Sequence, residues 1–249
     1  MLNTIKFIAA SAAFTCAGAA FSSDNACTLQ SGKNILPVVE LYTSEGCSSC
    51  PPADQWLSHF KGKPAVVQAF HVGYWDQLGW VDRFATPAHT VRQRQIGMWN
   101  QQGSIYTPQA VLNGKDWRNW GGTLDGKPAE PGLANISLRQ LANDQFEATV
   151  TPVAGGPAHW SAYWTVTENG YSSKVKAGEN AGEFLQHDFV VRQYVVAGVY
   201  ASNGPSDGAA VQKLTFRSIA ATPEHSRQVN LVVFDPQTGK TLQAISAPC

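Results

Sequence analysis

The order of apolar and polar positions predicts alternating strands and helices in the first half of the chain. Apolar, β-favouring runs at residues 35–42 and 65–72 indicate two buried strands. Between them, residues 47–60 place apolar side chains at helical spacing behind two consecutive prolines, which favour the first turn of a helix. A second helix is expected over 86–99, and residues 105–114 end in Asn-Gly, a hairpin signal. This order predicts an α/β fold.

The pattern changes after a segment rich in glycine and proline at residues 121–135, which we interpret as a loop or linker. Polar and apolar side chains then alternate over 160–167, and β-favouring runs follow at 189–200 and 229–234. Several strands at this spacing predict a small antiparallel β-sandwich. The fold class expected for the whole chain is therefore α/β, with a β-rich domain following the first.

The first 19 residues have the features of an export signal. Lys6 supplies one positive charge, an apolar run extends from Phe7 to Ala17, and Ala17-Gly18-Ala19 fits a cleavage site. The apolar run is too short to span a bilayer comfortably. We therefore expect an exported protein, periplasmic or secreted and without a membrane span, with an α/β domain at 20–126 and a β-rich domain at 127–249.

Composition and charge exclude several classes of function. The 249 residues are 43% hydrophobic, which is enough to form one or two cores. Eighteen basic and eighteen acidic residues cancel, so no overall field attracts nucleic acid or anionic lipid. Neither a Walker loop nor a GxGxxG turn occurs in the sequence. Nucleotide-dependent and nucleic-acid-binding functions are therefore disfavoured.

The cysteines predict two disulfides. Removal of residues 1–19 leaves Cys27, Cys47, Cys50 and Cys249, an even number that suits an oxidising compartment. Cys47 and Cys50 are separated by two residues, which leaves Cys27 and Cys249 to tie the two ends of the mature chain together. The alternative is that these two cysteines remain free thiols.

The Cys47-Ser48-Ser49-Cys50 motif opens the first predicted helix, and this position favours redox chemistry. A helix N-terminus offers unpaired N–H groups and positive potential, which stabilise a thiolate at Cys47. Cys50 can then close a disulfide or resolve a mixed one. The spacing also forms half of a zinc site, but zinc would have to recruit Cys27, Cys249 or distant histidines. A purely structural disulfide is the third alternative.

Three segments carry a family resemblance: 38–54 (VVELYTSEGCSSCPPAD), 71–84 (HVGYWDQLGWVDRF) and 106–109 (YTPQ). They resemble an uncharacterised family of exported bacterial thioredoxin-like proteins of unknown function. The resemblance covers about residues 38–115 and implies a thioredoxin fold without importing an established activity. Gly73 stands where an acidic residue would be expected, which leaves any charge role at that position in doubt.

Further candidates for the site surround the dithiol. Thr107-Pro108 occupies the place where thioredoxin-like folds carry a cis-proline, so we expect a cis bond and a backbone that pairs with an extended partner segment; the alternative is an ordinary turn. Glu40 is a candidate for proton transfer, as thioredoxins keep a buried acid behind the dithiol, or else a structural acid. Trp75 and Tyr106 are candidate substrate-binding residues, although buried aromatic anchors are commoner.

Other polar residues are expected to have structural or solvent-facing roles. Glu45 should face solvent, because its charge would oppose thiolate formation beside Cys47. His71 is interpreted either as a core histidine or as a proton donor or metal ligand near the dithiol. Arg92 and Arg94 should form a solvated helix face.

The leading functional hypothesis is an exported thiol–disulfide oxidoreductase that acts on protein disulfides or dithiols. Cys47 would be the nucleophile and Cys50 the resolving residue, with no cofactor, because electrons come from another dithiol protein. The alternative is a copper-binding protein or metallochaperone that uses Cys47, Cys50 and His71, since thiolates suit Cu(I). A third hypothesis is a binding module, which predicts a buried, unreactive Cys47.

Overall fold

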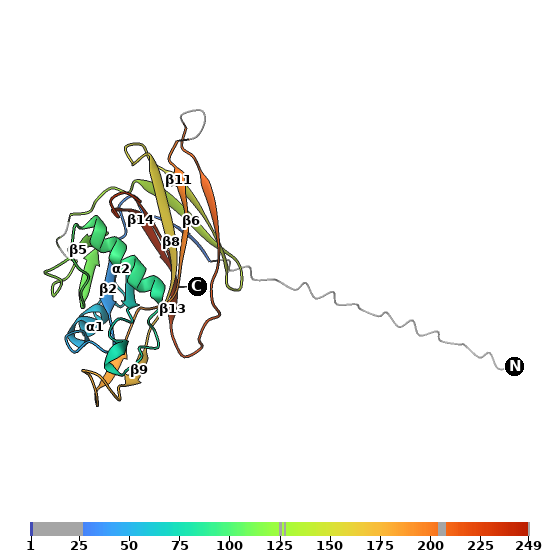
Figure 1. The fold of residues 1–249 in the computed structure, drawn as a ribbon. Coiled ribbons are helices and arrows are strands. Elements are labelled where there is room, and N and C mark those ends of the chain that lie inside the picture. Colours follow the sequence, from blue (N-terminus) through green and yellow to red (C-terminus); the bar gives the residue numbers. More distant parts are fainter. Residues whose placement is uncertain (2–26, 125, 127, 204–207, 249) are drawn as a thin grey trace.

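A computed structural model describes residue 1 and residues 27–248, apart from 125, 127 and 204–207 (Figure 1). The helices are α1 (Pro51–Ser58), the short 3-10 helix η1 (Asp76–Leu78) and α2 (Pro87–Trp99). The strands are β1 (Thr28–Gln30), β2 (Val38–Thr43), β3 (Val66–His71), β4 (Gln109–Leu112), β5 (Lys115–Asp116), β6 (Ala134–Ala142), β7 (Gln145–Pro152), β8 (His159–Glu168), β9 (Tyr171–Lys174), β10 (Phe184–His187), β11 (Val190–Ala201), β12 (Gln212–Arg217), β13 (Arg227–Phe234) and β14 (Thr241–Ala247). The expected α/β class is confirmed.

Helices α1 and α2 cover opposite faces of the sheet that contains β2. Val39 and Leu41 pack in one core cluster with residues of α1. Tyr42, the next residue, packs in another cluster with Ile96 of α2. Because successive side chains of a strand point to opposite faces, β2 is buried on both sides. This double burial is why its sequence is a nearly continuous apolar run.

One eight-stranded sheet runs through both halves of the chain, in the order β14-β13-β8-β11-β3-β2-β4-β5. β2 and β3 are parallel, and β4 is antiparallel to β2. β11 joins β3 in parallel where Val190 pairs with Ala69. The domain division expected between residues 126 and 127 falls in the loop that joins β5 to β6. The segments on its two sides thus share a sheet.

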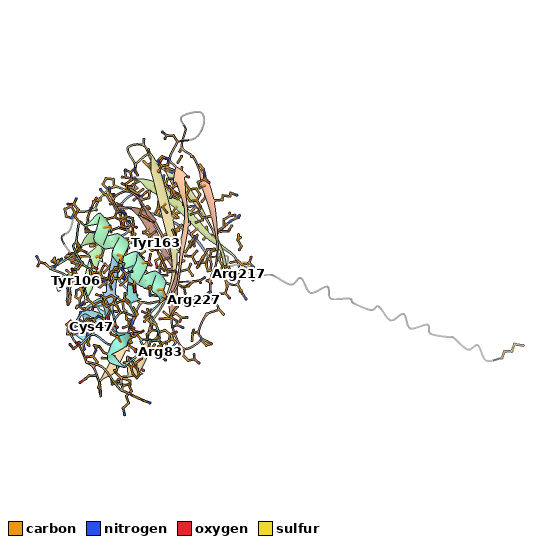
Figure 2. All side chains as sticks on the ribbon, in the orientation of Figure 1. Cys47, Arg83, Tyr106, Tyr163, Arg217 and Arg227 are labelled. Carbon is orange, nitrogen blue, oxygen red and sulfur yellow. A yellow bond between two sulfur atoms is a disulfide. The ribbon has the colours of Figure 1, made fainter. Side chains whose placement is uncertain are left out.

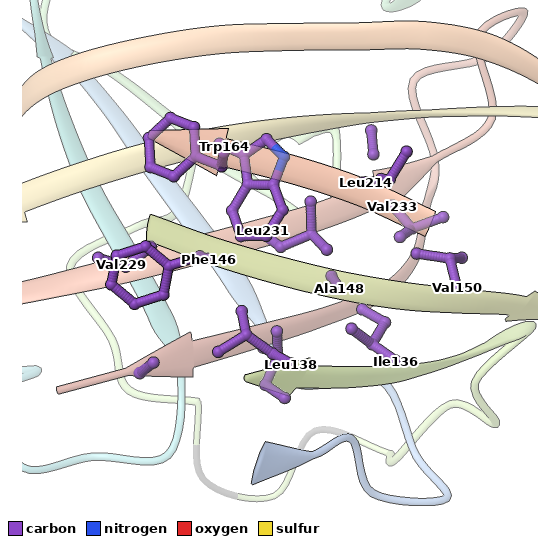
Figure 3. Packing of buried hydrophobic residues seen from close by; sticks show 14 of the residues in the cluster. Ile136, Leu138, Phe146, Ala148, Val150, Trp164, Leu214, Val229, Leu231 and Val233 are labelled. Carbon is purple, nitrogen blue, oxygen red and sulfur yellow. The ribbon is translucent and has the colours of Figure 1, made fainter. Parts of the chain in front are cut away.

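A second sheet, in the order β1-β6-β7-β12, faces the β8, β13 and β14 end of the large sheet. Alternate residues of both sheets meet in one apolar core, in which Trp164 stacks on Phe216 with ring centroids 5.0 Å apart. Figure 3 shows Leu138, Phe146 and Leu231 in this layer. Strands β6, β7 and β12 bury one face in this core, whereas β8, which carries the alternation noted at residues 160–167, is buried on both faces.

A separate two-stranded hairpin, β9-β10, returns from the second half of the chain to the region of α1. β10 packs against α1, and Figure 1 shows β9 at the same end of the molecule as η1. This hairpin brings residues 171–187 beside the CxxC motif.

Two predictions concern the ends of the chain. No helix among the described residues is long and apolar enough to cross a membrane. The signal peptide expected at 1–19 lies almost wholly outside those residues, as does Cys249. Cys27 is disulfide-bonded, and its pairing with Cys249 stays a prediction.

Candidate functional site

The CxxC motif follows β2 after a short turn and leads directly into α1. Cys47 and Cys50 form the expected disulfide, and Cys50 is the N-cap residue of α1. Pro51 occupies the first helical position, where a missing N–H costs nothing. Figure 2 shows Cys47 on the side of the molecule that carries α1. A Cβ atom on Gly46 would lie 2.9 Å from Cβ of Trp75, so only glycine fits the turn before Cys47.

Both cysteines of the motif are buried. Cys47 is 1% exposed and Cys50 0% exposed. Ser48 and Ser49 between them face solvent, and Ser49 Oγ lies 3.4 Å from Cys47 Sγ. The motif is therefore exposed to solvent at its two serines, and its two cysteines are buried. Burial of this kind is what the binding-module hypothesis predicts for Cys47.

The peptide bond between Thr107 and Pro108 is cis, as expected. The indole N–H of Trp75 donates a hydrogen bond of 2.8 Å to Thr107 Oγ1. Trp75 also packs against Gly46. It therefore joins residues 45–50, which we call the CxxC turn, to the Thr107-Pro108 loop. The structure thus brings Cys47, Trp75, Thr107 and Pro108 together; their roles in exchange stay predictions.

Tyr106 is turned toward β5. Its hydroxyl donates a 2.8 Å hydrogen bond to Asp116 Oδ1, and its carbonyl oxygen accepts one of 2.7 Å from Gln93. Partial burial and the bond to the Asp116 carboxylate raise the pKa of Tyr106. These contacts hold the loop that carries Thr107 in place. The substrate-binding role of Tyr106 stays a prediction.

Glu40 lies in a buried ion pair with Arg92. The guanidinium of Arg92 donates from Nη2 to Glu40 Oε1 at 2.6 Å and from Nε to Oε2 at 2.8 Å. The hydroxyls of Tyr42 and Tyr163 also donate to this carboxylate. The expectation that Arg92 is solvated is wrong: Arg92 is 6% exposed, because Glu40 faces α2 and supplies the compensating charge. Arg94 is exposed as expected.

Glu45 is buried, contrary to the expectation that it faces solvent. Its Oε2 accepts a 2.6 Å hydrogen bond from the indole of Trp80, and its Oε1 lies 3.2 Å from Nε2 of His187. Burial alone would raise the pKa of Glu45, but the nearby polar groups of His187, Ser173 and Trp80 outweigh it and the pKa is lowered. These partners are remote in sequence, so the local pattern around Glu45 gave no sign of them.

His187, at the end of β10, lies between the acids that flank the CxxC motif. Besides Glu45, it faces Asp54, with 3.8 Å between His187 Nδ1 and Asp54 Oδ2. Asp54 lies one helical turn after Cys50, and its backbone N–H donates to the Cys50 carbonyl. Burial raises the pKa of Asp54. Sequence reasoning missed His187, because it lacks ligand spacing.

His71, at the end of β3, is paired with Asp82. His71 Nδ1 lies 2.7 Å from Asp82 Oδ2, and the same oxygen accepts the backbone N–H of Glu45. Burial would raise the pKa of Asp82, but His71 and the backbone donors lower it to about 2. Burial would lower the pKa of His71, but Asp82 raises it. His71 is thus a core histidine that supports the turn before the dithiol.

The residues expected to hold copper do not form a metal site. Over the described part of the chain, no three His, Cys, Asp or Glu side chains come together in a way that could hold a metal ion. Nδ1 of His71 is paired with Asp82, and the His71 ring packs edge-on against the rings of Phe84 and His187. The copper alternative has no geometric support.

The loop between β9 and β10 is bound to the CxxC turn. Asn180 Nδ2 donates to the backbone carbonyls of Glu45 at 2.9 Å and of Cys47 at 3.0 Å. Glu179 Oε2 accepts the backbone N–H of Ser48 at 2.9 Å. No motif in this loop pointed to it, because its role depends on the return of the hairpin to α1.

A large cavity of about 970 Å³ lies away from this chemistry. It is bordered by Trp56 of α1, by Phe60 just after this helix, and by residues of β1, β14 and the loop after β5. None of the CxxC residues lines it. The candidate site is therefore the CxxC turn and the side chains around it.

Comparisons with known proteins find two solved structures of similar fold. Among curated proteins, none matches. A crystal structure of a structural-genomics protein from Agrobacterium tumefaciens is 23% identical, with a TM-score of 0.63 over 87% of this chain and 95% of that one. HBP35 of Porphyromonas gingivalis is 16% identical, with a TM-score of 0.53 over 87% of this chain and 76% of that one. At these identities the likeness concerns the fold alone.

The model of a family described as "Protein of unknown function (DUF1223)" matches residues 38–234, which include the CxxC turn, the Thr107-Pro108 loop and the β9-β10 hairpin. The expected membership of an uncharacterised family is thereby confirmed. The chain belongs to the DUF1223 family of proteins of unknown function.

Proposed function

We propose that this protein is an exported thiol–disulfide oxidoreductase whose redox centre is Cys47–Cys50. One observation carries the proposal: the CxxC disulfide at the start of α1 is joined through Trp75 to the cis Thr107-Pro108 loop. A helix N-terminus favours a thiolate at Cys47. A backbone segment beside it offers a place for an extended partner chain.

The fold proposed for the first half is thioredoxin-like, and the second half is proposed to be a β-sandwich. Support for the first comes from parallel β2 and β3, antiparallel β4 and helices on both faces of the sheet. Support for the second comes from two sheets that face each other across one core. The shared sheet makes the second half a direct neighbour of the first.

The exchange reaction needs only the two cysteines and a partner with two sulfurs. Cys47 thiolate attacks a partner disulfide, forms a mixed disulfide and releases the first partner thiolate. Cys50 thiolate then attacks Sγ of Cys47, forms the Cys47–Cys50 disulfide and releases the second partner thiolate, and both released thiolates take protons from water. Two electrons pass from the protein dithiol to the partner disulfide, and the reverse sequence oxidises a partner dithiol. No cofactor takes part in the proposal.

The proposed location is the periplasm or the extracellular space. The sequence features of residues 1–19 and the even number of cysteines in the mature chain support it. An oxidising compartment would also supply the dithiol or disulfide proteins that the reaction requires.

The test uses the mature protein, its Cys47→Ser variant and its Cys50→Ser variant with a disulfide-containing peptide. We expect the reduced wild type to cleave the peptide disulfide and Cys47→Ser to be inactive. Cys50→Ser should accumulate a mixed disulfide at Cys47, seen by mass spectrometry, because the resolving thiol is absent. Exchange by Cys47→Ser at the wild-type rate would overturn the proposal.

A non-catalytic binding module is the second candidate, favoured by the burial of both cysteines. In that case the disulfide is structural and does not cycle. A titration of the folded protein in thiol–disulfide buffers from about −300 to −120 mV separates the two candidates. A reversible transition at Cys47–Cys50 supports the oxidoreductase, and a disulfide that stays closed throughout supports the binding module.

A further inference from the structure

We propose that residues 175–183, the loop between β9 and β10, form a latch that holds the CxxC turn closed and must release it before Cys47 reacts. We call these residues the latch loop. The inference rests on the proposed function, because it concerns access to the same disulfide. It assigns Asn180 as a positioning residue that controls this access.

The first contact is made by the amide of Asn180. Its two N–H groups are divided between the carbonyl oxygens of Glu45 and Cys47, at 2.9 and 3.0 Å. Asn180 is itself buried, at 5% exposure. Two buried hydrogen bonds to successive parts of one turn fix its backbone, and leaving such groups unpaired is costly. Asn180 thus restrains the turn on both sides of Gly46.

The second contact is made by Glu179, which accepts the backbone N–H of Ser48 at 2.9 Å. This N–H belongs to the motif itself, between the two cysteines. Glu179 is exposed, so water competes for the same donor and the contact can open readily. The latch loop therefore combines one buried and one exposed attachment to the CxxC turn.

The latch loop is closed on itself, and its hairpin forms no strand pair with either large sheet. Gly178 of the loop lies against Leu78, the last residue of η1, and against Trp80. The backbone N–H of Val175 donates to Glu183 at 3.0 Å, and that of Gly182 donates back to Val175 at 2.9 Å. Gly178 and Gly182 have positive φ angles of 76° and 95°, a conformation that glycine adopts without strain. The loop can move away from the CxxC turn without breaking strand pairs of either large sheet.

Access to sulfur requires such a movement. A thiolate attacks a disulfide at one sulfur atom, so exchange depends on how far that atom is reachable. Cys47 is 1% exposed while the latch is closed. Trp75 also lies against the turn, at Gly46, so both the latch loop and Trp75 contact the turn. Release of Asn180 would free the backbone of Glu45 and Cys47 to move outward.

The experiment measures how fast a small reductant opens Cys47–Cys50 in the folded, oxidised mature protein. Wild type, Asn180→Ala, Glu179→Ala and a matched control in the same loop, Lys176→Ala, are mixed with dithiothreitol, and free thiols are alkylated at timed intervals and located by mass spectrometry. Lys176 is exposed and holds no contact to the CxxC turn among the described interactions.

We expect Asn180→Ala to be reduced at least about tenfold faster, since two buried hydrogen bonds of ordinary strength are lost. Glu179→Ala should be reduced about two- to threefold faster, and Lys176→Ala at the wild-type rate. An Asn180→Ala rate equal to that of wild type would overturn the latch. If circular dichroism shows that Asn180→Ala is partly unfolded, the test rests on Glu179→Ala. A Glu179→Ala reduction rate equal to that of wild type would then overturn the latch.

The outcome is separable from that of the proposed function. Reduction by dithiothreitol needs no partner protein, so a latch is detectable even if peptide exchange is absent. Inactivity of both wild type and Cys47→Ser toward peptide disulfides would contradict the oxidoreductase alone. Equal rates of reduction for wild type, Asn180→Ala and Glu179→Ala would contradict the latch and would leave the proposed oxidoreductase function unaffected.

Discussion

Arg92 of α2 holds Glu40 of β2 in a two-pronged ion pair within the core, with N–O distances of 2.6 and 2.8 Å. Tyr163 of β8 donates to the same carboxylate, and the guanidinium lies 4.0 Å from the centre of the Tyr163 ring. Figure 2 shows Tyr163 near the middle of the molecule, close to α2. The pair therefore links the first half of the chain to a strand of the second half, and it uses the acid that the sequence offered as a proton carrier.

The ion pair predicts a structural rather than a redox effect of Glu40. Glu40→Gln should destabilise the fold by about 3–5 kcal/mol, because Arg92 is left buried without its counter-charge. The double variant Glu40→Leu, Arg92→Met should be less destabilised than Glu40→Gln. Urea unfolding gives both values. An unchanged stability of Glu40→Gln, together with an altered pH profile of thiol exchange, would instead support the proton-transfer role.

Asp82 predicts a loss of stability at low pH. Its pKa is lowered from 3.8 to about 2 in the folded state by His71 and backbone donors. Stability from this group is therefore present above pH 3.8 and is lost as the pH falls through about 2. Asp82→Asn should cost about 2 kcal/mol at pH 7 and much less near pH 2. Urea unfolding at both pH values tests this, with Glu183→Gln as an exposed control; a cost independent of pH would contradict the assignment.

Asp54 predicts the opposite dependence of stability on pH. Burial raises its folded-state pKa, so the unfolded chain releases the proton more easily and stability falls as the pH rises above 3.8. Asp54→Asn should therefore be more stable than wild type at pH 7 and equal to it near pH 3. Thermal unfolding at these pH values measures the difference. A less stable Asp54→Asn protein at pH 7 would show that pairing of the Asp54 carboxylate with His187 dominates.

The position of Gly114 predicts that close packing between the first and second halves of the chain contributes strongly to stability. It lies in the β4-β5 turn at a φ of 83°, and a Cβ atom there would collide with the carbonyl oxygen of Gly239 in the β13-β14 turn. Gly114→Ala should cost about 3 kcal/mol or more, from backbone strain and steric overlap together. Gly155→Ala is the matched control, because Gly155 has a φ of 88° and open space around it. Equal costs for both variants would show that the contact with Gly239 yields easily.

The elements around the CxxC motif could be predicted because their signals are local. The apolar run of β2 reflects burial on both faces, Pro51 and Pro87 mark helix starts, and the cysteine spacing implies the disulfide. The cis bond at Thr107-Pro108 was expected from the place that thioredoxin-like folds give to a cis-proline, just before a hairpin strand. Each of these features is decided by residues within a few positions of one another.

The surroundings of the dithiol could not be predicted, because they depend on one distant strand pairing. β11 joins β3, and this places the β9-β10 hairpin over α1. Only then do His187 and Asn180 reach Glu45 and Cys47. Nothing in the sequence near Glu45 shows that its charge has a buried partner. The burial of Arg92 is of the same kind, since its partner Glu40 is supplied by another element.

Trp75 predicts a difference between large and small disulfide substrates. Trp75→Phe keeps the backbone and Cβ atoms that lie against Gly46 but removes the indole N–H that donates to Thr107 Oγ1 at 2.8 Å. Loss of one hydrogen bond of about 1 kcal/mol should loosen the Thr107-Pro108 loop. Exchange with a disulfide-containing peptide, which is proposed to lie along this loop, should therefore slow about fivefold. Exchange with glutathione disulfide, which is too small to need the loop, should keep its rate.

Both rates follow from single-turnover mixing of the reduced protein with each disulfide, quenched with acid and resolved by mass spectrometry. Trp120→Phe is the control, because Trp120 packs on Trp56 away from the CxxC turn. If Trp75→Phe slows the two substrates equally, Trp75 acts on the dithiol itself, through its contact with Gly46. If it slows neither, the loop holds its shape without this bond, and partner selection must lie with other residues around Cys47.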